Sequence, residues 1–424
     1  MRRPSVGTVL ATGLTIGALV IAALNLMPDR RELRDRLPSV MGSSDPAFLR
    51  SMNGLYGSNL LPGNHVETLV NGDQIFSAML EAIRGAETSI NFETYVYWSG
   101  EIAETFADAL AERARAGVEV RVLLDWFGSK PMEADLLRRM EEAGVSVTRF
   151  RPVHWYTIDR INNRTHRKLL IVDGHIGFTG GVGVADEWLG DARHPGEFRE
   201  NHYRVTGPVV AMLQGAFVSN WVEDSGEILR GDAFFPELEP TGDMIAQLAL
   251  SSTGSRNDIH MMLMTALAGA ERHIRIATPY FIPDDVAIRQ LVDARARGVE
   301  VDILLPGPEI NKPPVRRASR ALWGPLLQAG VRIHEYEPTF LHAKLLIVDD
   351  ALASVGSTNF DERSFRLNDE ANLNVFDTAF AEEQIAMFEA DLARSRPVTL
   401  AEWQARSWST RAGDWLWSLL RPQL

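Results

Sequence analysis

The chain has 424 residues, of which 45% are hydrophobic and 23% are charged, and this composition is typical of a globular protein with room for two domains. It contains no cysteine, which excludes disulfides, thiolate metal sites and a cysteine nucleophile. The formal net charge of −13 disfavours a nucleic-acid partner, although it does not exclude a local basic groove.

The N-terminal segment is the most apolar part of the chain. No charged residue occurs from Pro4 to Pro28, and about 20 apolar residues suffice to span a bilayer as a helix. We expect residues 1–28 to form a membrane anchor, because the stretch is long for a cleaved signal peptide and no small-x-small cleavage site follows it. Arginines lie on both sides of the span, so the positive-inside rule only weakly favours a cytoplasmic body. Residues 29–60 are expected to be a juxtamembrane linker.

The body of the chain contains an internal repeat of apolar strands and amphipathic helices. The run GAETSINFETYVYW corresponds to the later GAERHIRIATPYFIP, and ARAGVEVRVLLDWFGS corresponds to ARGVEVDILLPG. Strands that alternate with helices indicate an α/β fold. We therefore predict two similar domains, residues 61–230 and 251–396, each with a mixed, mostly parallel sheet flanked by helices. Residues 231–250, which begin with the turn-rich GDAFFPELEPTG, are expected to link them.

Each half carries a histidine, a lysine and an aspartate at the same spacing. The two runs read HRKLLIVD and HAKLLIVD and differ at a single position. Their members are His166, Lys168 and Asp173 in the first half and His342, Lys344 and Asp349 in the second. Side chains two positions apart in a strand face the same side, so each histidine and its lysine should point together. Each aspartate should lie at the far strand end, where we expect a structural role such as a turn hydrogen bond.

The duplicated histidines and lysines predict one active site, shared between the halves, that performs phosphoryl chemistry. Imidazole can attack phosphorus and ammonium can hold phosphate oxygens, but ammonium is not a metal ligand, so we expect neither metal nor cofactor. A histidine in this role needs an acceptor at its second ring nitrogen. Glu200 and Glu370 precede corresponding strands of the two halves and are the best candidates. The alternative is that both are exposed carboxylates at strand starts.

The glycine turns that follow the motifs differ between the halves. The second half has Gly356-Ser357-Thr358-Asn359, whereas the first has Gly180-Gly181-Val182-Gly183. We therefore expect Ser357 and Asn359 to contact phosphoryl oxygens through their side chains, while the first half offers only backbone donors.

Residues 397–424 form a tail that is rich in tryptophan. Trp403, Trp408, Trp415 and Trp417 are interleaved with arginines, a combination that favours the membrane–water interface. Equally, the tail could be a terminal helix that packs its tryptophans onto the body.

Over about residues 65–395 the chain resembles the phospholipase D superfamily, and within it the bacterial cardiolipin synthases. The residues that carry the resemblance are NRTHRKLLIVDG, TPYFIPD, FLHAKLLIVD and GSTNFDERSFRLNDE. One position departs from the family pattern, because Gly183 stands where these enzymes usually have an asparagine.

The resemblance implies a pseudo-twofold pair of domains and a metal-free displacement in two steps. His166 would be the nucleophile that forms a phosphatidyl-histidine, and His342 would be the acid and base, while Lys168 and Lys344 stabilise charge on the phosphoryl oxygens. The implied reaction joins two phosphatidylglycerols into cardiolipin and releases glycerol at a bacterial inner membrane.

Three other functions stay open at this point. The chain could be a hydrolytic phospholipase D with water as the acceptor, a nuclease of the same fold, or an inactive scaffold. The apolar N-terminus and the acidic balance disfavour a nuclease, and the intact motifs disfavour a scaffold. The sequence does not define the oligomeric state.

Overall fold

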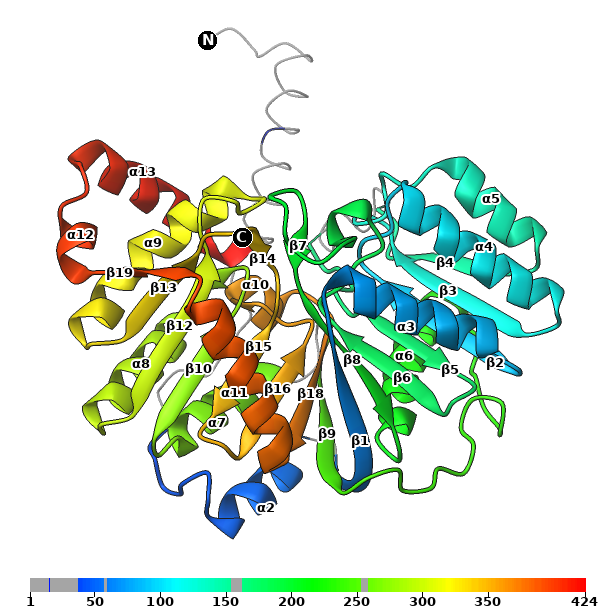
Figure 1. Ribbon diagram of the computed structural model, residues 1–424, viewed down its shortest axis with the longest axis horizontal. Helices are drawn as coiled ribbons and strands as arrows, with labels where there is room; N and C mark the ends of the chain where they lie inside the picture. Colours follow the sequence, from blue (N-terminus) through cyan, green and yellow to red (C-terminus); the bar gives the residue numbers. More distant parts are fainter. Residues whose placement is uncertain (1–14, 16–36, 57–58, 154–161, 253–257) are drawn as a thin grey trace, which may run out of the picture.

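A computed structural model of the chain describes residue 15 and residues 37–56, 59–153, 162–252 and 258–424. Two halves of similar build lie side by side and are joined at the centre by their sheets (Figure 1). The first half comprises β1 (Leu61–Val70), α3 (Asn71–Gly85), β2 (Ser89–Thr94), α4 (Glu101–Arg115), β3 (Glu119–Asp125), α5 (Ala134–Glu142), β4 (Ser146–Phe150), β5 (Leu169–Val172), β6 (Ile176–Gly180), the 3₁₀ turn η2 (Asp186–Trp188), β7 (Phe198–Arg199), β8 (Asn201–Thr206) and α6 (Val210–Ser225).

The second half repeats this order and adds short elements near the centre of the molecule. It comprises β9 (Met244–Ser251), α7 (Asp258–Gly269), β10 (His273–Ala277), β11 (Phe281–Ile282), α8 (Asp285–Ala296), β12 (Glu300–Pro306), α9 (Pro313–Gln328), β13 (Arg332–Tyr336), β14 (Phe340–Leu341), β15 (Leu345–Val348), β16 (Leu352–Gly356), β17 (Phe360–Asp361), α10 (Glu362–Arg366), β18 (Glu370–Phe376) and α11 (Thr378–Leu392). The tail follows as β19 (Ser395–Val398), α12 (Leu400–Gln404), α13 (Trp408–Ser418) and the 3₁₀ turn η3 (Arg421–Gln423).

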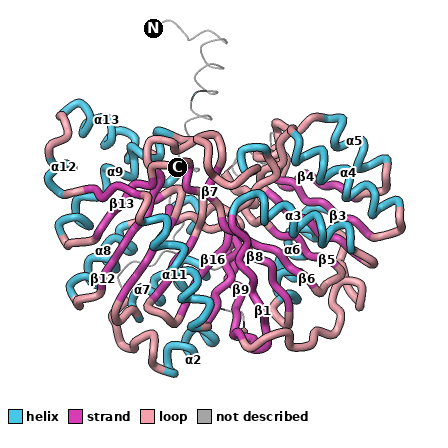
Figure 2. Tube along the Cα trace, viewed as in Figure 1, coloured by secondary structure: helices cyan, strands magenta, loops and turns pink. Residues whose placement is uncertain are grey.

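The strands form one continuous sheet of 15 strands (Figure 2). Outward from the centre, the first half runs β1-β8-β6-β5-β2-β3-β4, and the second runs β9-β18-β16-β15-β10-β12-β13, with β19 at the edge. The two orders correspond strand for strand, and an antiparallel pairing of β1 with β9 joins them. The internal repeat is therefore a structural repeat about an approximate twofold axis.

The prediction of a mostly parallel sheet is wrong. Of the 14 neighbouring pairs in this sheet of described strands, only β2/β3, β3/β4, β10/β12 and β12/β13 are parallel. The alternation of strand and helix that suggested parallel pairing holds only for these outer strands. Each motif strand instead returns through a tight turn to its neighbour, β5 to β6 and β15 to β16, and such hairpins are antiparallel.

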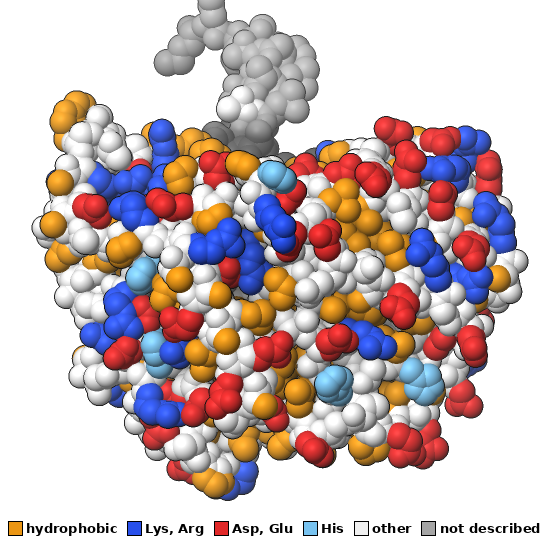
Figure 3. All heavy atoms as spheres, in the orientation of Figure 1, with side chains coloured by type: hydrophobic (Ala, Val, Ile, Leu, Met, Phe, Trp, Pro, Cys, Tyr) orange, Lys and Arg blue, Asp and Glu red, His pale blue; other side chains and the backbone are white. Residues whose placement is uncertain are grey.

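Three large hydrophobic clusters hold the helices on the sheet. One lies under α3, α4 and α5 of the first half, and one lies under α7, α8 and α9 of the second. The third contains residues of α6 and α11 together with strand residues of both halves. This shared cluster makes the two halves one packing unit. Acidic and basic side chains are interspersed over the face seen in Figure 3, and neither kind forms a large patch of its own on that face.

The structure describes parts of the segments that were expected to be linkers. Within the linker expected at residues 29–60, α2 (Pro46–Leu55) packs Phe48 and Met52 into the core of the second half. The connection expected at 231–250 overlaps β9, so the second half begins at Met244. Apart from residue 15, the expected anchor at residues 1–28 lies outside the described residues. In the part of the chain that is described, no helix is long and apolar enough to cross a membrane.

Candidate active site

Short backbone contacts across the twofold axis place the two motif histidines. The N–H of His166 donates to the carbonyl of Asp369 at 2.8 Å, and the N–H of His342 donates to the carbonyl of Arg199 at 2.7 Å. Beside the second contact, β14 pairs with β7 in parallel. Each histidine is thus bonded to the residue that directly precedes a glutamate of the other half.

The side chains follow the same crosswise arrangement. His166 Nδ1 lies 2.9 Å from Glu370 Oε2, and His342 Nδ1 lies 2.5 Å from Glu200 Oε2. Both glutamates are completely buried, so they are not the exposed strand-start residues of the alternative interpretation. A carboxylate at Nδ1 accepts a hydrogen bond from the ring proton there, so that Nε2 is the ring nitrogen without a proton. In His342 this Nε2 lies 3.3 Å from Lys344 Nζ.

The two carboxylates have different surroundings. Glu370 accepts hydrogen bonds from Ser357 Oγ at 2.6 Å and Asn368 Nδ2 at 3.2 Å, and burial nevertheless raises its pKa. Burial acts in the same direction on Glu200, but Lys344 and His342 outweigh it and lower the pKa of this carboxyl. Glu200 therefore holds its negative charge more firmly than Glu370.

Both motif lysines are buried beside the histidines. Lys168 Nζ donates to the carbonyl of His166 at 2.6 Å, and Lys344 Nζ donates to the carbonyl of His342 at 2.5 Å. Burial lowers the pKa of Lys168 to about 7 and that of Lys344 to about 8, against the pull of Glu200 and Glu370. Together these lysines form a cationic centre between the halves.

Burial also lowers the pKa of both histidines, with further contributions from the motif lysines. For His342 the pKa falls to about 3. Both rings are therefore neutral at neutral pH before a substrate binds, and a neutral imidazole is the form that can attack phosphorus. An anionic group placed between the lysines would shift both histidine pKa values upward.

The motif aspartates lie at the far ends of the motif strands. The carboxylate of Asp173 accepts three backbone hydrogen bonds, from Glu87, Thr88 and Ser89. Asp349 does the same for the corresponding residues of the second half, Glu271, Arg272 and His273. Both aspartates have positive φ, 53° and 55°, and each ties the hairpin turn to the start of the neighbouring strand.

The glycine turns after the motifs lie against the two buried glutamates. A Cβ on Gly181 would lie 2.3 Å from a Glu200 oxygen, so glycine is needed for the close approach of this carboxylate. In the second half the hydroxyl of Ser357 donates to Glu370 Oε2 at 2.6 Å, and its contact with phosphate stays a prediction. Asn359 lines the pocket, and its Oδ1 has no partner among the described residues.

The position of Gly183 is filled by other side chains. A Cβ there would lie 2.8 Å from Cβ of Val96 and 3.2 Å from the ring of Trp188. Trp188 packs edge-on against His342 with ring centroids 5.3 Å apart, and Phe198 and Phe340 contact the same imidazole. Val96 and the ring of Trp188 thus occupy the space that an asparagine side chain at this position would need.

A pocket of about 340 Å³ opens beside the histidines. His166 lines it, and most of the other lining residues were not identified from the sequence. Asn359 is the exception, and the others are Tyr95, Phe127, Asn162, Arg164, Tyr280, Lys312, Val315, Asp361, Arg363, Asn368, Gln423 and Leu424. The signal for Tyr95 and Tyr280 lay in the repeat itself, since each closely follows the first strand after a Gly-Ala pair. Gln423 and Leu424 come from the far end of the tail and gave no such signal.

One group of side chains in the described part of the chain has ligand atoms close enough for a metal ion, His273, Glu300 and Asp302. None of them lines the histidine pocket. Arg332 donates to Asp302 at 2.6 Å and to Glu300 at 2.7 Å. The guanidinium already supplies the positive charge that a metal would bring, so the group is a salt-bridge cluster.

Duplicated α/β halves that share two histidine–lysine motifs define the architecture of the phospholipase D superfamily. Comparison with known proteins agrees. The family described as "Cardiolipin synthase, PLD-like domain" matches residues 79–189 and 263–392. The chain belongs to this cardiolipin synthase family.

Individual relatives are similar over most of their length. "Cardiolipin synthase 2" of Bacillus anthracis is 35% identical over 381 residues, which cover 89% of this chain and 74% of the relative. The major cardiolipin synthase of Bacillus subtilis is 36% identical over 85% of this chain and 76% of its own. Among solved structures, a phosphatidylserine synthase of Haemophilus influenzae has a similar fold, with a TM-score of 0.69 at 13% identity, covering 89% of this chain and 99% of that one.

Proposed function

We propose that this protein is a phosphatidyltransferase that converts two phosphatidylglycerols into cardiolipin and glycerol. The observation that carries the proposal is the crosswise pairing of His166 with Glu370 and of His342 with Glu200. It supplies two oriented imidazoles in one cationic centre, which is what a double displacement at a phosphodiester requires. The cardiolipin synthases among the relatives point to the substrate.

In the first step, Nε2 of His166 attacks the phosphorus of one phosphatidylglycerol. The anionic substrate raises the pKa of His342, so that its ring takes up a proton from solvent when the substrate binds. The bond from phosphorus to the glycerol headgroup oxygen breaks, and the protonated ring of His342 donates this proton to that oxygen, so that glycerol leaves. The phosphatidyl group remains bonded to His166. We assign His166 as the nucleophile because it lines the pocket.

In the second step, His342 takes a proton from a headgroup hydroxyl of the second phosphatidylglycerol. The hydroxyl oxygen attacks phosphorus, the bond to His166 breaks, and cardiolipin forms. Glu200 supports this role because its low pKa keeps a negative charge beside His342, where it stabilises the imidazolium. The less firmly charged Glu370 serves mainly to orient His166.

Lys168 and Lys344 hold the phosphoryl oxygens in both steps. Charge on these oxygens changes most in the transition state, and preorganised cations in a buried site stabilise it strongly. Asn359 adds a side-chain amide at the pocket wall. Asp173 and Asp349 contribute by holding the motif strands in place.

The proposed location is a bacterial inner membrane, with residues 1–28 as a single anchor. The apolar N-terminal stretch and a lipid substrate support this location.

The test is to incubate the purified full-length protein with phosphatidylglycerol in detergent micelles and identify the products. Cardiolipin with glycerol in equal amounts is the expected result. Phosphatidic acid with glycerol would show that water is the acceptor and that the protein is a phospholipase D. Single-stranded DNA serves as the control substrate, and its cleavage would point to a nuclease.

A further inference from the structure

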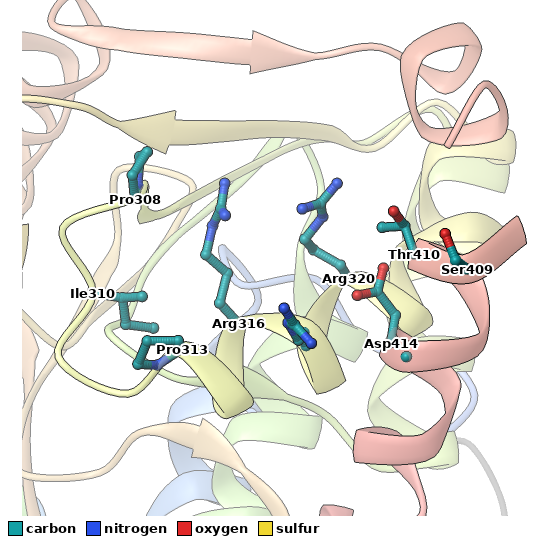
Figure 4. Close-up of a pocket in the computed structure, with 10 residues that line it drawn as sticks. Pro308, Ile310, Pro313, Arg316, Arg320, Ser409, Thr410 and Asp414 are labelled. Carbon is teal, nitrogen blue, oxygen red and sulfur yellow. The ribbon is translucent and has the colours of Figure 1, made fainter. Parts of the chain in front are cut away.

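A second pocket, of about 470 Å³, lies between α9 and the tail helix α13. Three arginines of α9 line one side, Arg316, Arg317 and Arg320, and the other side has the hydroxyls of Ser409 and Thr410 on α13. Figure 4 shows Arg316 and Arg320 extending in the same direction, with Ser409, Thr410 and Asp414 approaching from α13. A cluster of guanidinium groups facing hydroxyls is suited to an anion with several oxygens, such as a phosphodiester.

The charges of this pocket are not balanced within the protein. Arg316 pairs with Glu335 at 2.6 Å, and the carboxylate of Asp414 is taken up by Arg406 at 2.5 Å. Among the described residues, no carboxylate forms an ion pair with Arg317 or Arg320. Two guanidinium groups are thus available to a ligand, in a chain whose net charge is −13.

The surface beside the pocket is apolar and exposed. Trp408 is 81% exposed and Trp415 is 60% exposed, and both belong to α13. Leu416, Leu419 and Leu420 continue this surface. In the space-filling view, hydrophobic side chains protrude at the upper left corner, over α12 and α13 (Figure 3). Exposed tryptophan and leucine next to cationic groups are the side chains that settle at a lipid–water interface.

The tail also connects this surface to the active site. After α13, Gln423 and Leu424 line the histidine pocket, and Asn162 Nδ2 donates to Gln423 Oε1 at 2.7 Å. Helix α9 also connects the two pockets. Lys312 and Val315, near its start, line the histidine pocket, and its arginines line the pocket between α9 and α13. In Figure 1 the tail runs from α12 and α13 at the outer edge inward to the chain end, which lies near α10.

We propose that the pocket between α9 and α13 binds the phosphate of an anionic phospholipid while α13 lies in the membrane surface. The guanidinium groups of Arg317 and Arg320 contact the phosphate oxygens, and Trp408 and Trp415 enter the interface beside the same lipid. The lipid held here is not the one that reacts. It positions the edge of the enzyme that carries the active-site pocket against the bilayer.

The test uses the full-length protein in zwitterionic detergent micelles and measures quenching of tryptophan fluorescence by brominated lipids. Dibrominated phosphatidylserine is the anionic probe, because it is not the proposed substrate and binding is then independent of the proposed reaction. Dibrominated phosphatidylcholine is the matched zwitterionic probe. The variant W408F/W415F gives the quenching that arises from the other eight of the ten tryptophans.

We expect brominated phosphatidylserine to quench the wild type at lower mole fraction than brominated phosphatidylcholine, and this difference to vanish in W408F/W415F. The double variant R317Q/R320Q should need about 25-fold more anionic lipid, at about 5-fold for each basic group near the lipid surface. The control R115Q removes an exposed arginine of α4 in the first half and should behave as wild type.

Equal quenching by both lipids, or an unchanged response in R317Q/R320Q, would overturn the proposal. So would the absence of lipid quenching together with thermal stabilisation by inorganic phosphate that R317Q/R320Q abolishes. That result would assign the pocket to a free phosphate anion.

Discussion

The two halves of this protein use the same motif in different surroundings. His166 opens onto a polar pocket with Arg164, Lys312 and Arg363, whereas His342 is enclosed by Trp188, Phe198 and Phe340. The glutamates that pair with these histidines also differ, since the pKa of Glu370 is raised and that of Glu200 is lowered. A duplicated sequence can therefore supply two distinct roles, because each histidine takes its environment from both halves.

The most severe test of this comparison is removal of either histidine. His166→Ala and His342→Ala should each lower turnover by at least 10²–10⁴-fold, because general acid–base catalysis alone contributes that much and loss of a nucleophile costs more. Turnover of phosphatidylglycerol is the measurement, with circular dichroism to check folding. Trapping with a slow substrate should place the phospho-adduct on His166. An adduct on His342 would exchange the two roles while keeping the shared site.

The glutamates sharpen the comparison. Glu200→Gln and Glu370→Gln should lower kcat by roughly 10²–10⁴-fold with little change in KM, because an amide cannot stabilise an imidazolium and can favour the wrong tautomer. We expect the larger loss for Glu200→Gln, since its partner His342 is the ring that carries the proton. Equal losses would show that both carboxylates only orient their rings.

The single difference between the motifs, Arg167 against Ala343, should appear in stability. Arg167 is buried and donates to the carbonyl of Ala216 at 2.8 Å and to Ser252 Oγ at 2.9 Å. Arg167→Ala should lower the free energy of unfolding by about 3 kcal/mol, because several buried acceptors lose their donor. The matched change Ala343→Gly should cost about 1 kcal/mol. Denaturant titration measures both, and similar values would contradict the asymmetry.

The lysines predict a pH dependence. Their pKa values of about 7 for Lys168 and about 8 for Lys344 lie below the usual 10.5, so they lose their protons at unusually low pH. As pH rises through 7–8, kcat/KM should fall by about tenfold per unit, because a neutral amine does not hold a phosphate oxygen. In Lys168→Arg the falling limb should move to higher pH. A rate that stays constant from pH 6 to 9 would rule out this use of the lysines.

The smallest effect is expected outside the two halves. Deletion of residues 1–28 should leave the catalytic body folded, with a rate in detergent micelles close to that of the full chain. The rate on bilayer vesicles should fall several-fold, because a tether raises the local concentration of lipid. Equal rates on vesicles would contradict the proposed role of residues 1–28 in raising the local lipid concentration.

Local repetition explains what could be predicted from the sequence. The motif histidines, the lysines and the paired glutamates recur at matching positions, and the strand period shows which side chains share a face. The pairing of each histidine with the opposite glutamate could not be predicted in this way. It depends on two-residue strands such as β7 and β14, whose partners are 142 residues apart, and nothing local in the sequence specifies them.

The direction of the strands and the segments that form the pocket walls could also not be predicted from local sequence patterns. Alternating strands and helices suggested parallel neighbours, but the hairpin turns after Val172 and Val348 reverse the chain. Gln423 and Leu424 reach the pocket only because α13 packs along α9. Both features follow from tertiary packing, which sets which segments meet.

The antiparallel contact of β1 with β9 joins the two halves at the centre of the sheet. Enzymes built from separate lobes often admit and release their ligands by swinging the lobes about a hinge, but here such a swing would have to break this backbone pairing and open the hydrophobic cluster that both halves share. We therefore expect the four-chained product to leave without such a swing, past the side chains and short segments at the rim of the pocket. The residence time of the product should then respond to substitutions at that rim, such as Leu424→Ala, rather than to substitutions at the junction of the halves.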